Sequence, residues 1–158
     1  MKPIARRTRS ALTLVLLSAA GLGCPMGGTV DHLDARSLAG TRWRLIEIRS
    51  MDDAIGTTRP DDPSKYTLAF AADGTLAMRL DCNRAMGRWS ATPAADSEGG
   101  QLRVGPLAAT RALCPEPSLD ERIARDMDYV RSYLVKDGRL HLSLMADGGI
   151  YVWERDPS

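Results

Sequence analysis

The sequence is poor in aromatic residues, in histidine and in cysteine, and its charges nearly cancel. Because Phe70 is the only phenylalanine, we expect the core to be built from aliphatic side chains and the three tryptophans. The formal net charge is +1, and it becomes −3 without residues 1–23, which contain four basic and no acidic side chains. Nucleic-acid binding needs a basic face and anionic lipid attracts polybasic segments. The charge therefore argues against nucleic acid as a partner and against an electrostatic route to membranes.

Residues that carry catalysis and metal binding are scarce. The two histidines, His32 and His141, are far apart in the sequence and do not supply a zinc site, so we expect no metal and no cofactor. The sequence has no glycine-rich phosphate-binding loop and no Gly-Xaa-Ser-Xaa-Gly nucleophile elbow. The acidic pairs Asp52-Asp53 and Asp61-Asp62 are typical of solvated turns, with weak calcium binding as the alternative. We expect a domain that is not an enzyme.

The N-terminal apolar run is too short to cross a bilayer, which takes roughly 20 residues. It follows a basic opening that contains Lys2 and Arg6, and it ends in small residues at Cys24. This order is typical of a bacterial export signal, and the cysteine at its end predicts a lipoprotein. We interpret residues 1–23 as the signal peptide and Cys24 as the site of lipidation. The alternative is ordinary cleavage after Ala20, which leaves Cys24 as a free thiol.

A lipid on Cys24 would be enough for stable attachment to a membrane, since a triacylated cysteine supplies several chains. We therefore expect an exported protein, on the periplasmic face of the outer membrane through its lipid or in the periplasm. Residues 24–37 are rich in glycine and polar side chains, which is typical of a flexible tether. The folded domain is predicted over residues 38–155. Besides the membrane, the expected partner is an unknown envelope protein or small ligand.

Alternation of apolar and polar residues predicts several short strands. Asp73-Gly74 and the segment 146–149 are typical of hairpin turns. The predicted strands lie at residues 43–49, 66–70, 75–80, 87–92, 101–104, 140–145 and 150–153. Many short strands with one helix indicate a mainly β fold: a small antiparallel domain with an open barrel-like sheet and one amphipathic α-helix packed on it.

Only one segment has a helical period. Its apolar residues recur at spacings of four, four, three and four, so they share one face of a helix: Leu119, Ile123, Met127, Val130 and Leu134. Ser118 and Glu121 have the spacing of a capping box, which predicts the start of this helix. Asp137-Gly138 predicts its end, because glycine is the usual residue just past a helix.

Three motifs occur in order along the predicted domain: 38–43 (Leu-Ala-Gly-Thr-Arg-Trp), Cys82-Asn83 with Gly87 and Trp89, and Thr110 with Leu113-Cys114-Pro115. Together they resemble the META domain family of HslJ-like exported lipoproteins, over about residues 38–154. The resemblance implies a small β-rich domain, usually exported and associated with stress tolerance or motility. It implies no active site. One departure is Asp81, where glycine is common in the family.

Cys82 and Cys114 would meet an oxidising compartment, where pairing in a disulfide is the default. One alternative is a nucleophilic cysteine activated by His32 or His141. Another is a redox pair, although the close Cys-Xaa-Xaa-Cys spacing of redox motifs is absent. We favour a structural disulfide in a non-catalytic envelope lipoprotein domain with a binding or stress-tolerance role. The second hypothesis is a periplasmic thiol-redox protein or enzyme that uses both cysteines.

Four polar residues stand near the two cysteines in the sequence: Asn83, Arg84, Arg88 and Arg111. A Cys82–Cys114 bridge would draw them to one end of the sheet, where they would bind an anionic ligand or a carboxylate of a partner. The alternative is that Asn83 and Arg84 satisfy backbone groups in an irregular turn, as short polar side chains commonly do.

Overall fold

The computed structural model describes residues 38–95 and 98–157. The predicted signal peptide and tether, with Cys24 and His32, lie outside the described residues, so their assignments stay predictions. Within the described part, no helix has the length and apolar character needed to cross a membrane.

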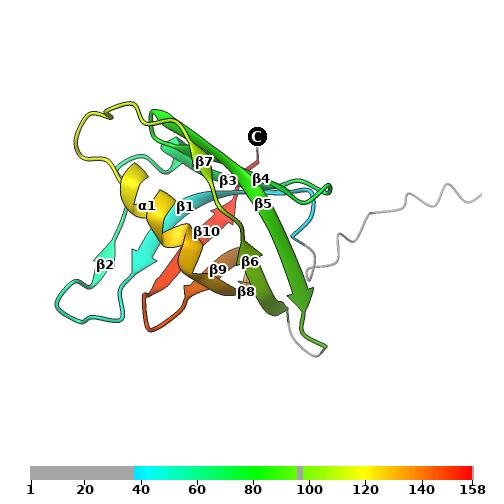
Figure 1. The fold of residues 1–158 in the computed structure, drawn as a ribbon. Coiled ribbons are helices and arrows are strands. Elements are labelled where there is room, and N and C mark those ends of the chain that lie inside the picture. Colours follow the sequence, from blue (N-terminus) through cyan, green and yellow to red (C-terminus); the bar gives the residue numbers. More distant parts are fainter. Residues whose placement is uncertain (1–37, 96–97, 158) are drawn as a thin grey trace, which may run out of the picture. The chain divides into compact units, whose positions relative to one another are not determined.

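Eight antiparallel strands form a closed barrel (Figure 1). Each strand pairs with the next one in chain order, and the last pairs back onto the first, which closes the sheet. In order they are β1 (Thr41–Arg49), β3 (Tyr66–Phe70), β4 (Thr75–Leu80), β5 (Asn83–Pro93), β6 (Gly99–Val104), β8 (Val130–Lys136), β9 (Arg139–Leu144) and β10 (Ile150–Arg155). The predicted mainly β fold is confirmed, with the barrel closed instead of open.

Alternate residues of these strands fill the barrel, as the period of two in a strand requires. Trp43 and Trp153 are fully buried, as expected from the sequence. Trp89 is only partly buried, and it packs edge-on against Phe70 with ring centroids 5.1 Å apart. On β1 the alternation shifts at a bulge between Leu45 and Glu47, so residues beyond it exchange faces.

Shorter elements lie outside the barrel path. The two-residue strand β2 (Thr57–Thr58) pairs with the end of β1, and the 3-10 turn η1 (Pro63–Lys65) leads into β3. The short strand β7 (Ala108–Ala109) pairs with Ala85 and Met86 of β5. The link between β6 and β8 carries β7, then α1 (Asp120–Asp126) and the 3-10 turn η2 (Met127–Tyr129).

The predicted long helix is wrong in its second half. The α-helix ends at Asp126, and the chain from Val130 onward is β8, paired with β6 and β9. The residues of β8 include β-branched and aromatic side chains that suit a sheet, and tertiary pairing decides the outcome. The predicted capping box is also absent: Leu119 is the N-cap and makes no side-chain cap hydrogen bond.

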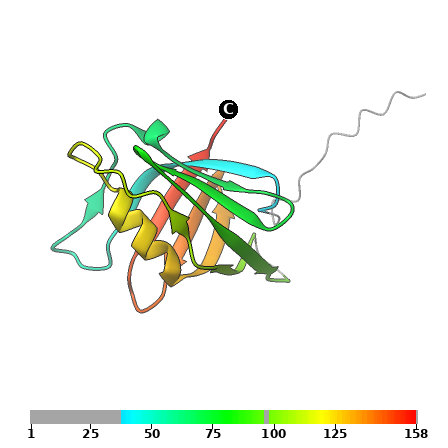
Figure 2. The ribbon, with the colours of Figure 1, turned by 45° about the horizontal axis from the view of Figure 1, so that its top comes forward.

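Helix α1 covers one end of the barrel (Figure 2). Ile123 of α1 and Met127 of η2 are fully buried in the core. Tyr66, at the start of β3, accepts a hydrogen bond from the Leu119 backbone N–H at 3.0 Å. Tyr151, near the start of β10, donates its hydroxyl hydrogen to Asp126 at 2.8 Å; burial and this bond raise the pKa of Tyr151. Both ends of the helix are thus fastened, to the two strands that flank β1.

Candidate functional site

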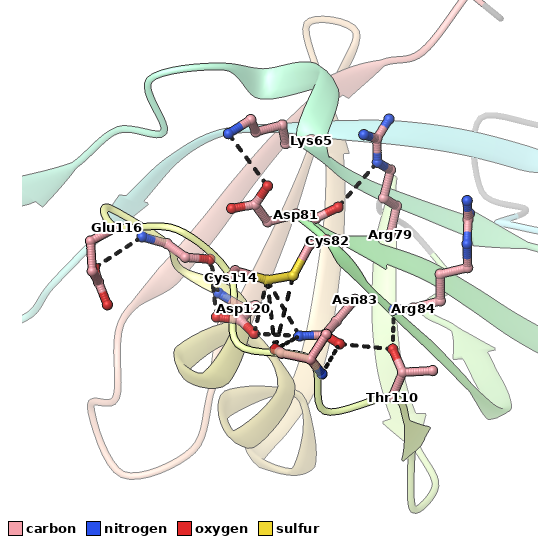
Figure 3. Close-up of a disulfide and its surroundings, with 12 residues drawn as sticks. Lys65, Arg79, Asp81, Cys82, Asn83, Arg84, Thr110, Cys114, Glu116 and Asp120 are labelled. Carbon is pink, nitrogen blue, oxygen red and sulfur yellow. Dashed lines mark hydrogen bonds and ion pairs between the residues drawn. A yellow bond between two sulfur atoms is a disulfide. The ribbon is translucent and has the colours of Figure 1, made fainter.

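Cys82 and Cys114 form a disulfide at the helix-covered end of the barrel, with their Cα atoms 5.6 Å apart (Figure 3). Cys82 lies in the turn between β4 and β5 and is exposed. Cys114 is buried and lies in the strap, the name used here for residues 110–119 between β7 and α1. The bridge therefore joins the strap to the barrel wall.

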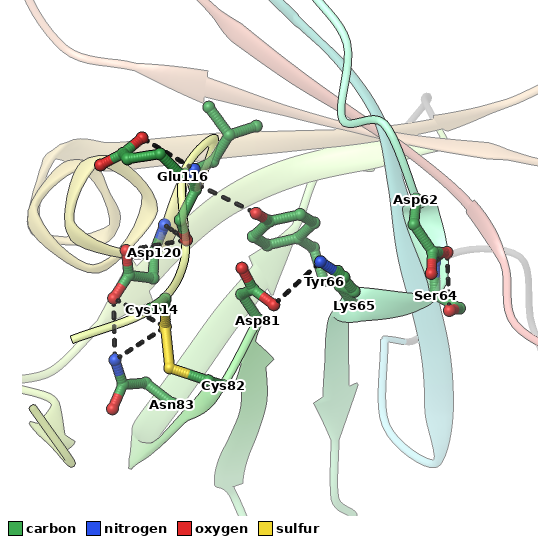
Figure 4. A network of polar contacts seen from close by, with 12 residues as sticks. Asp62, Ser64, Lys65, Tyr66, Asp81, Cys82, Asn83, Cys114, Glu116 and Asp120 are labelled. Atoms are coloured by element: carbon green, nitrogen blue, oxygen red, sulfur yellow. Dashed lines mark hydrogen bonds and ion pairs between the residues drawn. A yellow bond between two sulfur atoms is a disulfide. The ribbon is translucent and has the colours of Figure 1, made fainter. Parts of the chain in front are cut away.

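Asn83 is almost completely buried beside the disulfide and uses its whole hydrogen-bonding capacity. Its amide nitrogen donates to the carbonyl oxygen of Ala112 and to Asp120 Oδ2, each at 2.8 Å. Its amide oxygen accepts from the Thr110 hydroxyl and the Ala112 backbone N–H, again at 2.8 Å each. Two donor hydrogens and two acceptor lone pairs are thereby matched. Asn83 holds the strap and the start of α1, and it has no capacity left for a ligand (Figure 4).

Asp81 precedes the bridge in a left-handed backbone conformation, with φ of 56°. Glycine adopts this region without strain, and aspartate tolerates it better than most residues. The Asp81 carboxylate pairs with Lys65 at 3.4 Å, and its second oxygen is buried without a hydrogen bond. The turn that carries Cys82 is therefore fixed from the side of η1 as well.

A groove of about 560 Å³ lies between the strap, β7 and α1. Its apolar lining includes Leu107, Ala109 and Leu113, and the Leu113 side chain is 99% exposed. Charges of both signs line it too: Arg111, Asp120, Glu121, Arg125 and Asp128. The sequence did not indicate most of these residues as candidates for a binding site, because their proximity depends on where the strap crosses the helix.

The structure separates the four polar residues that the sequence grouped. Asn83 and Arg111 line the groove, whereas Arg84 and Arg88 lie exposed on the outer face of β5. The Arg88 guanidinium donates to the Asp73 carbonyl oxygen at 2.8 Å and to the Thr75 hydroxyl at 3.3 Å. It therefore lies against the turn between β3 and β4. Asn83 and Arg84 are successive residues of a strand and point to opposite faces, so the four residues do not form one cluster. Contact of the arginines with a ligand or partner stays a prediction.

His141 lies on β9, which β6 and β8 separate from β5. Partial burial, with the positive charges of Arg49 and Arg139, lowers its pKa. The structure therefore does not bring His141 to the cysteines as a base. In the part of the chain that the structure describes, no three His, Cys, Asp or Glu side chains group as metal ligands.

The fold, with the disulfide and the strap at its helix-covered end, defines the class of protein. It is a small, closed β-barrel domain whose strap is fastened by a disulfide. The family model of the META domain matches residues 36–156, which is most of the sequence. The chain belongs to the META domain family, as its motifs indicated. No curated protein matches it.

Solved structures with a similar fold include an NMR structure of a protein from Burkholderia xenovorans. That protein is 19% identical, with a TM-score of 0.62 over 78% of this chain and 87% of the other. The crystal structure of a DUF4847 family protein from Bacteroides vulgatus is 13% identical, with a TM-score of 0.54 over 77% and 96% of the two chains. At these identities the similarity concerns the fold alone.

Proposed function

We propose that this chain is a non-catalytic binding domain of the bacterial cell envelope, held at a membrane by a lipid on Cys24. The observation that carries the binding role is the groove beside the disulfide. It combines an exposed leucine with charges of both signs, and the buried polar groups at its base are occupied in holding the strap. Such a surface suits a partner segment or small ligand with apolar and charged parts.

The groove is testable by site-specific cross-linking in the envelope. A photoactivatable residue in place of Leu113 should capture a partner, and Ala109→Trp, which fills the groove from an exposed position, should abolish that capture. The matched control places the same photoactivatable residue at Met51, which is 54% exposed and does not line the groove. Capture of the same species from Met51, or capture that persists with Ala109→Trp, would contradict binding in the groove.

The lipid anchor is tested separately. Metabolic labelling with a fatty-acid analogue should mark the wild-type protein and leave Cys24→Ser unlabelled, because the thiol is the acceptor of the lipid. After cell fractionation, the wild type should sediment with membranes. Cys24→Ser, which lacks the lipid, should be recovered with the membranes in a smaller amount. Equal labelling of the two proteins would refute the anchor.

We include a role in stress tolerance, which the family resemblance implies, in the proposed function of this envelope domain.

The second candidate is a thiol-redox function of Cys82 and Cys114. One feature favours it: Cys82 is exposed, so an attacking thiolate has access to one sulfur of the bridge. Thiol titration of the purified protein with and without reductant separates the two functions. A bridge that resists mild reductants supports the structural role, and a labile one supports redox chemistry.

A further inference from the structure

The outer face of β3, β4 and β5 has charges of one sign only. Its outward positions hold threonine, alanine, serine, methionine and arginine, and none of them is acidic. We call Arg79, Arg84, Met86 and Arg88 on this surface the arginine face. Without residues 1–23 the net charge is −3, which argued against an electrostatic route to membranes, but the charges are unevenly distributed over the barrel and leave this face basic.

The strand register shows how the arginine face is built. Arg79 and Arg84 lie directly opposite each other on β4 and β5, and Ala77 lies opposite Met86. Figure 3 shows both arginine side chains standing off the barrel wall, away from the disulfide. Small side chains at Ala69 and Ala77 lead across the strands to Met86, which is 58% exposed. The face is therefore a shallow apolar row bordered by guanidinium groups.

Two carboxylates partly offset the charge of this face, because Arg79 acts on Asp62 and Arg88 acts on Asp73. Like charges directly opposite each other on neighbouring strands destabilise a sheet. Arg79 donates only to a backbone carbonyl, that of Asp81, and the Arg84 side chain has no hydrogen bond or ion pair with any described residue. The carboxylate of Asp73, at the edge of the face, accepts from the Thr75 backbone N–H. An anionic partner would relieve the repulsion.

The positive charge continues around the barrel. Arg88 lines a second hollow, of about 490 Å³, together with Arg103 and Arg131; one carboxylate, that of Asp128, is also in its lining. A guanidinium fork matches the geometry of a phosphate oxygen pair. Arg88 already donates to the turn between β3 and β4, and Arg131 to backbone carbonyls and to Met145. Arg103 makes no such bond with a described residue, so it is the guanidinium group in this hollow that can meet an anionic headgroup.

We propose that the arginine face docks the domain on an anionic bilayer surface. The position where the chain enters the domain supports a bilayer as the partner. There the Gly40 N–H donates to the Phe70 carbonyl, next to the turn whose carbonyls accept hydrogen bonds from Arg88 and Trp89. Only residues 25–37 separate Cys24 from Leu38, and an extended segment of this length spans about 45 Å. A lipid on Cys24 would therefore hold the domain within reach of headgroups. The inference rests on the proposed anchor, which supplies that proximity.

Vesicle co-sedimentation tests the docking without the anchor. The chain from residue 24 onward, with Cys24→Ser, is mixed with vesicles of phosphatidylcholine alone or of equal parts phosphatidylcholine and phosphatidylglycerol. We expect binding to the anionic vesicles only, with release at high salt. Arg79→Gln with Arg84→Gln should lower partitioning about 30-fold, the effect of two arginines near an anionic surface.

The matched control is Lys136→Gln with Arg139→Gln, an exposed cross-strand pair on the β8–β9 hairpin that changes the net charge equally. This pair should leave partitioning within about twofold of the parent, and circular dichroism should confirm that both double variants fold. Equal losses in the two variants, or binding to phosphatidylcholine alone, would overturn the proposal. Absence of binding to anionic vesicles would overturn it too and would favour an acidic protein as partner. None of these outcomes affects the labelling test of Cys24, so the two proposals fail separately.

Discussion

Replacing Cys82 and Cys114 together by alanine should lower the midpoint of thermal unfolding by about 10 °C. The two cysteines are separated by 32 positions in the sequence. Closing a loop of this length stabilises a fold by about 3–4 kcal/mol in the chain-entropy model, and a domain of this size loses a few degrees per kcal/mol. Thermal unfolding followed by circular dichroism measures the change.

The loss should be local at low temperature. The barrel closes through its own strand pairing, whereas the strap is held to it by the bridge and by Asn83. We therefore expect the β-type circular dichroism of the double variant to survive in the cold. Amide hydrogen exchange should increase in residues 110–119 before it increases in the barrel strands.

Two controls make this result specific. Cys24→Ser should leave the midpoint unchanged, because Cys24 lies outside the folded domain predicted over residues 38–155. Wild-type protein unfolded in strong reductant should approach the midpoint of the double variant. If the double variant keeps full stability but cells that carry it lose tolerance of envelope stress, the bridge is functional and the structural assignment is wrong.

The hairpins could be predicted from the sequence because they depend on neighbours in the chain. Tyr66–Phe70 and Thr75–Leu80 alternate cleanly around an Asp-Gly turn, and the structure has strands with these same bounds. The segment after Met127 also had a helical period, but it forms β8 because β6 and β9 offer it backbone partners. Whether this segment forms a helix or a strand depends on strands that are remote in the sequence. The local periodicity of apolar residues contains no information about such partners.

The site was predictable only in part, for a similar reason. Proximity to Cys82 in the sequence singled out Asn83, and the structure agrees with the alternative in which Asn83 satisfies backbone groups, here those of Ala112. Its further partner Asp120 comes from the start of α1. Strand alternation could have separated Asn83 from Arg84, because adjacent residues of a strand face opposite sides. The opposition of Arg79 and Arg84 follows from the β4–β5 register around the turn at Cys82, and no strand was predicted from the sequence on the far side of that turn before Gly87.

The Asn83→Leu substitution should lower the free energy of unfolding by about 3 kcal/mol. The leucine keeps the branched shape of the side chain, but it leaves the backbone N–H and carbonyl of Ala112 and the carboxylate of Asp120 without their side-chain partner. These hydrogen bonds are only partly buried, so each contributes about 1 kcal/mol, with somewhat more for the bond to the Asp120 carboxylate. Urea unfolding at constant m-value gives the difference. Thr110→Val, which removes one hydroxyl from the same network, is the milder control and should cost about 1 kcal/mol.

Comparison with Asn83→Asp identifies the network as the cause. This change keeps the acceptor for Thr110 and Ala112 but places a second carboxylate against Asp120 Oδ2, where the amide of Asn83 now donates at 2.8 Å. Two carboxylates this close repel unless one of them holds a proton, so the folded variant would bind a proton more readily than the unfolded chain. Its stability relative to wild type should therefore rise as the pH falls from neutral towards 4, whereas the deficit of Asn83→Leu, which adds no titrating group, should change little. Parallel pH profiles for the two variants would mean that Asn83 stabilises the strap through packing alone.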